Sequence, residues 1–170
     1  MQVVALPGRR SETESWLRQL LLAAGLHDAV VVRYRHWDSD VEARVPFEAA
    51  RLAEQAPQLV VAKSLGTVIA ATAFAHHGFR PAAAVLIGTP FEAIDADALD
   101  LLRQFACGVE TLFIQQREDP GGAADQLLEA LQLTRGRVAA VAGNDHLYLD
   151  TAALVDAMRP LIAALPAPPS

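Results

Sequence analysis

Ser64 is the residue of this chain best placed to act as a nucleophile. It lies in the octapeptide Val-Val-Ala-Lys-Ser-Leu-Gly-Thr, where an apolar β-branched run gives way to a helix-compatible stretch. Ala62 and Gly66, two positions away on either side, are small, as a sharp strand–turn–helix elbow with a strained apex requires. The sequence therefore predicts a serine hydroxyl at the apex of an elbow, with the backbone N–H of Leu65 beside it at the start of a helix.

A serine nucleophile needs a general base, and His146 is the histidine that we expect to supply it. It closely follows the sixth predicted strand, which places it at the same sheet edge as the elbow. His76 and His77 lie at the far end of the helix after the elbow, roughly 15 Å or more away at 1.5 Å per residue. His27 is expected at the surface, and His36, after the second predicted strand, is a weaker candidate for substrate contact.

Asp119 is the carboxylate expected to orient the imidazole of that histidine. It follows the fifth predicted strand, so it lies at the same edge of the sheet. Glu118 is the adjacent alternative. Asp145 touches the histidine in sequence, but neighbouring residues rarely achieve the required side-chain geometry, so we expect it to serve the loop or cap a helix. Asp95 and Asp97, after the fourth predicted strand, are a further alternative, although a solvated helix face also explains them.

An oxyanion hole needs a second backbone donor besides the N–H of Leu65. The loop after the first predicted strand, Pro-Gly-Arg-Arg-Ser, supplies one, and Gly8 lets the backbone approach closely. We expect the N–H of Arg9 to be this donor, to within one residue. The alternatives are a simple turn at Pro7 and Gly8, or a phosphate-binding loop, but neither a P-loop nor a Gly-x-Gly-x-x-Gly pattern follows the strand.

Apolar runs alternate with amphipathic stretches along the chain, and they predict the elements that position these residues. Strands are expected over residues 3–6, 29–34, 58–62, 82–87, 110–115 and 137–141. Helices are expected over residues 16–24, 47–55, from the elbow to about 78, 98–105, 123–131 and 151–164. Continuous apolar strands between amphipathic helices are typical of a parallel sheet covered on both faces. The predicted fold is therefore α/β: a doubly wound, mainly parallel six-stranded sheet with helices on both faces.

The length of 170 residues fits one domain with a core of its own. We expect this domain over residues 1–164, with a short cap segment at about 89–108 and a Pro-rich tail over 165–170 that frays. The sequence shows neither a basic leader nor an apolar run near the ~20 residues that span a bilayer. A single cysteine, Cys107, rules out an internal disulfide and suits a reducing, cytoplasmic location. We expect it to be a small buried apolar residue.

The charge balance argues against nucleic acid as a partner. The net charge is −6 and the basic residues are scattered, whereas phosphate neutralisation needs a clustered positive face. Lys63, the only lysine, directly precedes the predicted nucleophile, but adjacent side chains in an elbow diverge, so we expect a solvated neighbour and not a Ser–Lys pair. No His or Cys pair has the spacing of metal ligands, and neither a metal nor another cofactor is expected.

The chain order Ser64, Asp119, His146, each after a predicted strand, resembles that of the α/β-hydrolase fold over nearly the whole chain. The resemblance implies a serine hydrolase with a Ser-His-Asp triad. Ser64 would attack an acyl carbon, His146 would relay the proton and Asp119 would orient His146. The backbone amides of Arg9 and Leu65 would hold the oxyanion, and water would then hydrolyse the acyl-enzyme.

The chain departs from the pattern of that family in three respects. It lacks the first two strands, it has Ala62 where the elbow has glycine, and its first loop reads Pro-Gly instead of His-Gly. The chain resembles a minimal, single-domain member of this family. We expect it to be a monomer or a homodimer. The short cap implies an open site and a small-molecule acyl substrate, an ester or a thioester. A non-catalytic binding protein of the same fold and an acyltransferase are the alternatives.

Overall fold

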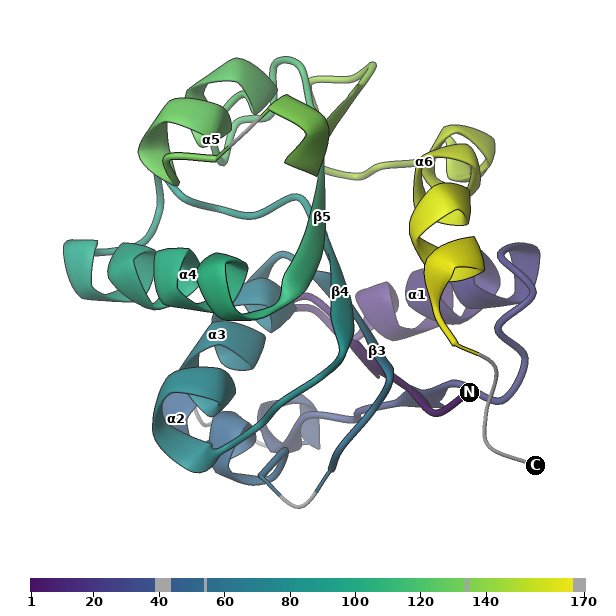
Figure 1. The fold of residues 1–170 in the computed structure, drawn as a ribbon, viewed down its shortest axis with the longest axis vertical. Helices are drawn as coiled ribbons and strands as arrows, with labels where there is room; N and C mark the ends of the chain where they lie inside the picture. Colours follow the sequence, from purple (N-terminus) through teal and green to yellow (C-terminus); the bar gives the residue numbers. More distant parts are fainter. Residues whose placement is uncertain (39–43, 54, 134, 167–170) are drawn as a thin grey trace.

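A single parallel sheet organises the computed structural model, which describes residues 1–38, 44–53, 55–133 and 135–166 (Figure 1). Within these residues the sheet has six strands in the order β2-β1-β3-β4-β5-β6, and every neighbouring pair is parallel. The strands are β1 (Val3–Leu6), β2 (Val30–Val31), β3 (Leu59–Lys63), β4 (Ala83–Ile87), β5 (Glu110–Gln116) and β6 (Val138–Val141). The predicted fold class is confirmed.

Helices cover both faces of this sheet (Figure 1). One face carries α2 (Val45–Ala50), α3 (Leu65–His77), α4 (Ala96–Gly108) and α5 (Ala124–Ala130), and the other carries α1 (Glu12–Ala23) and α6 (Thr151–Ala164). Successive strand residues point to opposite faces, so Val4 and Leu6 join the core under α2–α5 while Val3 and Ala5 join the core under α1 and α6. Burial on both faces explains why the strand sequences are apolar throughout.

The helix after the elbow, α3, lies buried between neighbouring helices and the sheet. Its residues 66–73 are all buried, which accounts for a sequence with no polar face. The hydroxyl of Thr72 donates to the carbonyl of Val68 (2.9 Å), so this buried polar group is satisfied within the helix. Gly78 ends the helix in the left-handed conformation (φ 72°), where glycine is favoured. Packing on all sides therefore sets where the first turn of the helix lies relative to the sheet.

The structure differs from the predicted element boundaries most at β2 and at two helices, of which α1 begins at Glu12, four residues before its predicted start. The second strand was expected over 29–34, but β2 has only two residues: the N–H of Val32 still donates to the carbonyl of Ala5 (2.9 Å), and the chain then turns into the 3-10 helix η1 (Arg35–Asp38). Helix α2 stops at Ala50 instead of continuing to 55; residue 54 is outside the described residues. The predicted tail lies outside them from residue 167 onward.

Cys107 corrects one prediction, because its side chain is exposed and not buried. In α4 the residues that face the core are Leu102, Phe105 and Ala106. The next position is rotated by about 100° around the helix, which turns Cys107 toward solvent. No helix among the described residues combines the length and the apolar character needed to cross a membrane.

The strand order creates a crevice at the carboxyl edge of the sheet. The chain leaves β1 toward β2 on one side, whereas β3 pairs with β1 on the other side and leads on to β4, β5 and β6. The loops that follow β1 and β3 therefore diverge, and ligands of open α/β sheets bind at such a switch point.

Candidate active site

The elbow at Ser64 joins β3 directly to α3. Ser64 has φ 51° and ψ −115°, a strained combination for a residue with a side chain. Its backbone N–H donates to the carbonyl of Ile87 (2.9 Å). Its carbonyl accepts from the N–H of Thr67 (2.9 Å) and from the hydroxyl of the same residue (2.7 Å). Hydrogen bonds on both sides thus hold the strained residue, and Leu65 becomes the first residue of the helix, where N–H groups lack intrahelical partners.

The small residues around the serine permit a close approach of α3 to β1. A Cβ atom on Gly66 would lie 2.3 Å from the carbonyl oxygen of Leu6, closer than any real contact. Ala62, on the strand side of the elbow, is paired with Leu6 and fully buried. The glycine is therefore required by contact with a neighbouring strand, in addition to the local turn.

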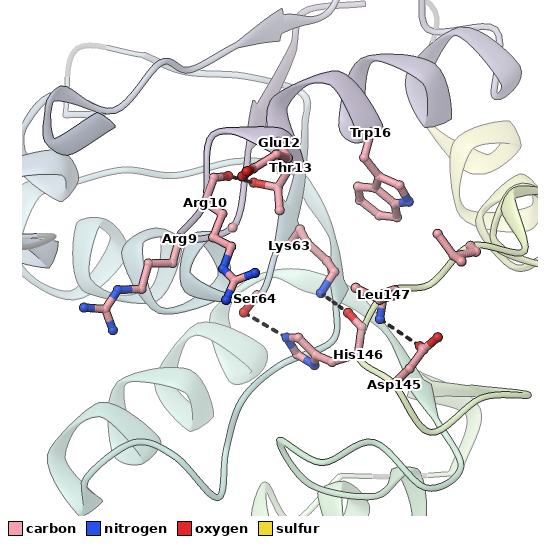
Figure 2. A pocket seen from close by; sticks show the side chains of 12 residues that line it. Arg9, Arg10, Glu12, Thr13, Trp16, Lys63, Ser64, Asp145, His146 and Leu147 are labelled. Atoms are coloured by element: carbon pink, nitrogen blue, oxygen red, sulfur yellow. Dashed lines mark hydrogen bonds between the residues drawn. The ribbon is translucent and has the colours of Figure 1, made fainter. Parts of the chain in front are cut away.

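Ser64, His146 and Asp119 form one continuous chain of hydrogen bonds. The Oγ of Ser64 lies 3.0 Å from Nε2 of His146 (Figure 2). The Nδ1 of His146 lies 2.8 Å from Oδ1 and 3.0 Å from Oδ2 of Asp119. An ionised carboxylate only accepts, so Nδ1 carries the proton and Nε2 is left to accept from the serine hydroxyl. The imidazole is thus held in the tautomer that a general base requires.

The carboxylate of Asp119 is buried, but it accepts several hydrogen bonds from the protein. It accepts from Nδ1 of His146, from the hydroxyl of Tyr148 at Oδ2 (2.5 Å) and from the N–H of Gly121 at Oδ1 (2.7 Å). Burial by itself raises the pKa of this group, but the hydrogen bonds outweigh burial and hold the pKa of Asp119 below its ordinary value. The group therefore stays ionised at neutral pH.

The loop that carries His146 is anchored by Gln116, the last residue of β5. The Oε1 of Gln116 accepts from the backbone N–H of Asp145 (3.2 Å) and of His146 (2.9 Å), while its Nε2 donates to Oδ1 of Asp145 (3.0 Å). His146 and Tyr148 both have positive φ, 61° and 59°. Anchoring of this kind is needed to keep two strained residues in place.

Lys63 corrects a second prediction, since it is buried (3% exposed) and not solvated. Its Nζ donates to the carbonyl of His146 (3.1 Å) and lies 4.7 Å from the ring centroid of Tyr148. Burial lowers the pKa of Lys63 to about 8, while the nearby carboxylates Asp119 and Asp145 oppose that effect. Lys63 faces the side of the sheet opposite to Ala62, which is why its side chain passes under the histidine loop.

Gly88, which follows β4, makes room for this arrangement. A Cβ atom at Gly88 would lie 2.9 Å from Nζ of Lys63, 2.8 Å from the ring of Tyr148 and 3.1 Å from the ring of His146. Sequence reasoning missed Gln116, Tyr148 and Gly88. The only local signal was a pair of glutamines at the end of an otherwise apolar strand.

The loop after β1 lies against the nucleophile and is held by aromatic side chains. A Cβ atom on Gly8 would lie 3.6 Å from Cβ of Ser64. The hydroxyl of Tyr34 donates to the carbonyl of Pro7 (2.8 Å). The carbonyl of Arg9 accepts from Nε1 of Trp37 (2.9 Å) and contacts Nε2 of His36 at the same distance. The peptide that contains the Arg9 N–H is therefore fixed on both sides.

The other sequence candidates lie away from the serine or serve the backbone. His36 supports the loop after β1. Asp145 accepts from the N–H of Leu147 (2.9 Å) in addition to Gln116. Asp95 caps α4 by accepting from the N–H of Ala98 (2.8 Å). Four further candidates have side chains exposed to solvent: Glu118, Asp97, His27 and His76. His77 is half-buried near the end of α3.

A pocket of about 600 Å³ opens beside Ser64 (Figure 2). Its lining comes from the loop after β1, the start of α1, the elbow and the histidine loop: Gly8, Arg9, Arg10, Glu12, Thr13, Trp16, Lys63, Ser64, Asp145, His146, Leu147 and Leu149. Segment 89–108, expected as a cap, contributes none of these described residues, because α4 packs against α3 on the sheet face. No group of three or more potential metal ligands occurs among the described residues.

Comparison with solved structures identifies a similar fold. A protein from Xanthomonas campestris pv. campestris, described as "a putative hydrolase of the alpha/beta superfamily", matches with a TM-score of 0.63 and 17% sequence identity. The match covers 96% of this chain and 99% of that chain. The chain therefore has an α/β-hydrolase fold. No protein-family model and no curated protein matches the sequence.

Proposed function

We propose that this protein is a serine hydrolase that cleaves small acyl esters or thioesters. The observation that carries the proposal is the hydrogen-bonded chain from Ser64 through His146 to the buried, ionised Asp119. A serine hydroxyl is a weak nucleophile at neutral pH, and an adjacent, correctly oriented base is what activates it. The fold alone supports a hydrolase only by analogy, so the proposal depends on the geometry of this site.

Acylation starts when Oγ of Ser64 attacks the carbonyl carbon of the substrate. Nε2 of His146 takes the hydroxyl proton, and the carboxylate of Asp119 stabilises the imidazolium that forms. The N–H groups of Leu65 and Arg9 stabilise the negative oxygen of the tetrahedral intermediate. The intermediate then collapses: Nε2 returns the proton to the leaving oxygen or sulfur, the alcohol or thiol departs, and Ser64 carries the acyl group.

Deacylation repeats these steps with water as the nucleophile. His146 takes a proton from the water, the resulting hydroxide attacks the acyl carbon, and the proton passes to Oγ as the serine is released. The products are a carboxylic acid and the enzyme with the hydroxyl group of Ser64 restored. An open pocket with no covering segment in its described lining gives both water and small esters access to the acyl carbon.

The test is covalent labelling by a fluorophosphonate probe, with the labelled site identified by mass spectrometry. We expect labelling of Ser64 in the wild-type protein and none in Ser64→Ala. Ser15→Ala is the matched control, because Ser15 is an exposed serine whose hydroxyl donates to the carbonyl of Glu12 (2.9 Å) within α1. Short-chain esters and thioesters then define the reaction.

A folded wild-type protein that remains unlabelled would contradict the proposal and favour a non-catalytic binding protein. Circular dichroism of each variant establishes that folding is intact. Labelling without release of free acid, together with transfer of the acyl group to an added alcohol or thiol, would identify an acyltransferase instead.

A further inference from the structure

Two leucines next to the candidate nucleophile expose their side chains to the pocket. Leu149 is 70% exposed and Leu147 is 57% exposed, the highest values among the large apolar side chains of the described residues. Both line the pocket beside Ser64, together with the half-buried indole of Trp16. Large apolar side chains left open to water around a binding site mark the place where an apolar ligand group binds.

The backbone of the histidine loop fixes this apolar surface. The positive φ angles of His146 and Tyr148 turn these two side chains inward, toward Asp119, and leave the intervening and following leucines facing out. Nε1 of Trp16 donates to the carbonyl of Tyr148 (3.2 Å), which ties α1 to the loop. Leu147 and Leu149 are therefore held in place by the same contacts that hold His146.

The apolar surface lies on the histidine side of the nucleophile. In Figure 2 the side chain of Leu147 lies on the same side of Ser64 as His146, and the indole of Trp16 lies past Lys63 from Ser64. His146 must protonate the leaving oxygen through Nε2, so the group attached to that oxygen lies next to the imidazole. The leaving group and the apolar surface thus occupy the same side of the pocket.

We propose that Trp16, Leu147 and Leu149 form an apolar subsite for the alkyl or aryl group attached to the leaving oxygen of the ester. This inference rests on the proposed function and narrows its substrate class to esters of apolar alcohols. The subsite acts in the acylation step, where the alcohol is still attached, and has no contact with the acyl-enzyme after the alcohol departs.

The experiment compares kcat/KM for the acetate esters of ethanol, butanol and hexanol. All three share one acetyl-enzyme, so differences between them report on the alcohol alone. We expect kcat/KM to rise with alcohol length, by at most about fourfold per methylene group, the equivalent of ~0.8 kcal/mol for complete burial. The double variant Leu147→Ser/Leu149→Ser is expected to remove most of this rise.

Leu22→Ser is the matched control, because Leu22 is similarly exposed (55%) on α1 but does not line the pocket. It should keep the wild-type dependence on alcohol length. A flat wild-type series in a protein whose Ser64 is labelled by the fluorophosphonate would overturn the subsite and leave the proposed function intact.

A second series, from ethyl acetate to ethyl hexanoate, varies the acyl group. If the double variant alters this series instead of the alcohol series, the assignment to the leaving group is wrong. Absence of both labelling and hydrolysis would overturn the proposed function, and the subsite with it.

Discussion

Lys63 places a positive charge in the interior beside the candidate base. Burial lowers its pKa from 10.5 to about 8, so the folded protein releases this proton at a lower pH than the unfolded chain does. Between about pH 8 and 10.5 the unfolded state therefore binds more protons, and the free energy of unfolding rises with pH in that window. Below pH 8 the charged ammonium is a cost to stability, one that its contacts with His146 and Tyr148 reduce but do not remove.

We expect Lys63→Met to abolish this pH dependence. In wild-type protein the gain from Lys63 is at most about 3.4 kcal/mol, from a pKa difference of about 2.5 at 1.36 kcal/mol per pH unit. Urea unfolding between pH 7 and 9.5 measures the part of this gain that falls between pH 8 and 9.5, about 2 kcal/mol at 1.36 kcal/mol per pH unit. The difference between wild type and variant isolates Lys63; a difference that stays constant across this range would contradict the lowered pKa.

The residues of the candidate site were predictable to different extents from the sequence. Ser64, Asp119 and His146 each come after a strand, and parallel strands bring their carboxyl ends to one edge. Their catalytic roles stay a prediction. The burial of Lys63 was not predictable, since it depends on the path of a loop 83 residues away. The same holds for Tyr148, whose contact with Asp119 requires a backbone conformation that the sequence does not signal.

Gly66 shows how one helix position controls the contact between α3 and β1. Replacing it with Ala puts a Cβ atom 2.3 Å from a backbone oxygen of Leu6, which cannot move without disturbing the central strand β1. We expect Gly66→Ala to destabilise the protein by about 1–3 kcal/mol, despite the better helix propensity of alanine, because overpacking outweighs the ~1 kcal/mol propensity gain. Urea unfolding at pH 7 measures the effect.

Gly136→Ala is the control for that comparison. Apart from its chain neighbours, no atom of the described residues lies within 4 Å of a Cβ added at Gly136, and the residue has no positive φ, so its replacement should change stability by no more than about 0.5 kcal/mol. If the two substitutions changed the free energy of unfolding equally, close packing at Gly66 would not contribute to stability.

The sequence predicts the bounds of a strand well where both faces of that strand are buried. The predicted β1 agrees at both ends and β3, β4 and β5 agree to within one residue, because continuous apolar runs mark central strands. Helix α6 has the predicted bounds. The edge strand β2 was overestimated: the N–H of Val32 still donates to the carbonyl of Ala5 (2.9 Å), but the chain then leaves the sheet, and Tyr34 is buried outside it. An apolar sequence pattern indicates which residues are buried. At the edge of a sheet, a residue can be buried without pairing with a neighbouring strand.

The sheet joins the core under α2–α5 to the core under α1 and α6, so we expect the described parts of the chain to unfold together. Leu127 lies fully buried in the first core and Leu17 in the second. Leu127→Ala and Leu17→Ala should each cost about 2–5 kcal/mol. Each variant should still show one calorimetric transition, with equal calorimetric and van't Hoff enthalpies. Two separated transitions in either variant would contradict the prediction of a single domain over residues 1–164.

The two tryptophans of the chain both use their indole N–H to hold a loop of the candidate site. Trp37 bonds the carbonyl of Arg9 in the loop after β1, and Trp16 bonds the carbonyl of Tyr148 in the histidine loop. Each of the two loops therefore carries a tryptophan in direct contact with its backbone. We therefore expect the intrinsic fluorescence of the protein to change when either loop moves, and stopped-flow fluorescence during acylation or on addition of an unlabelled alcohol measures this without any added dye.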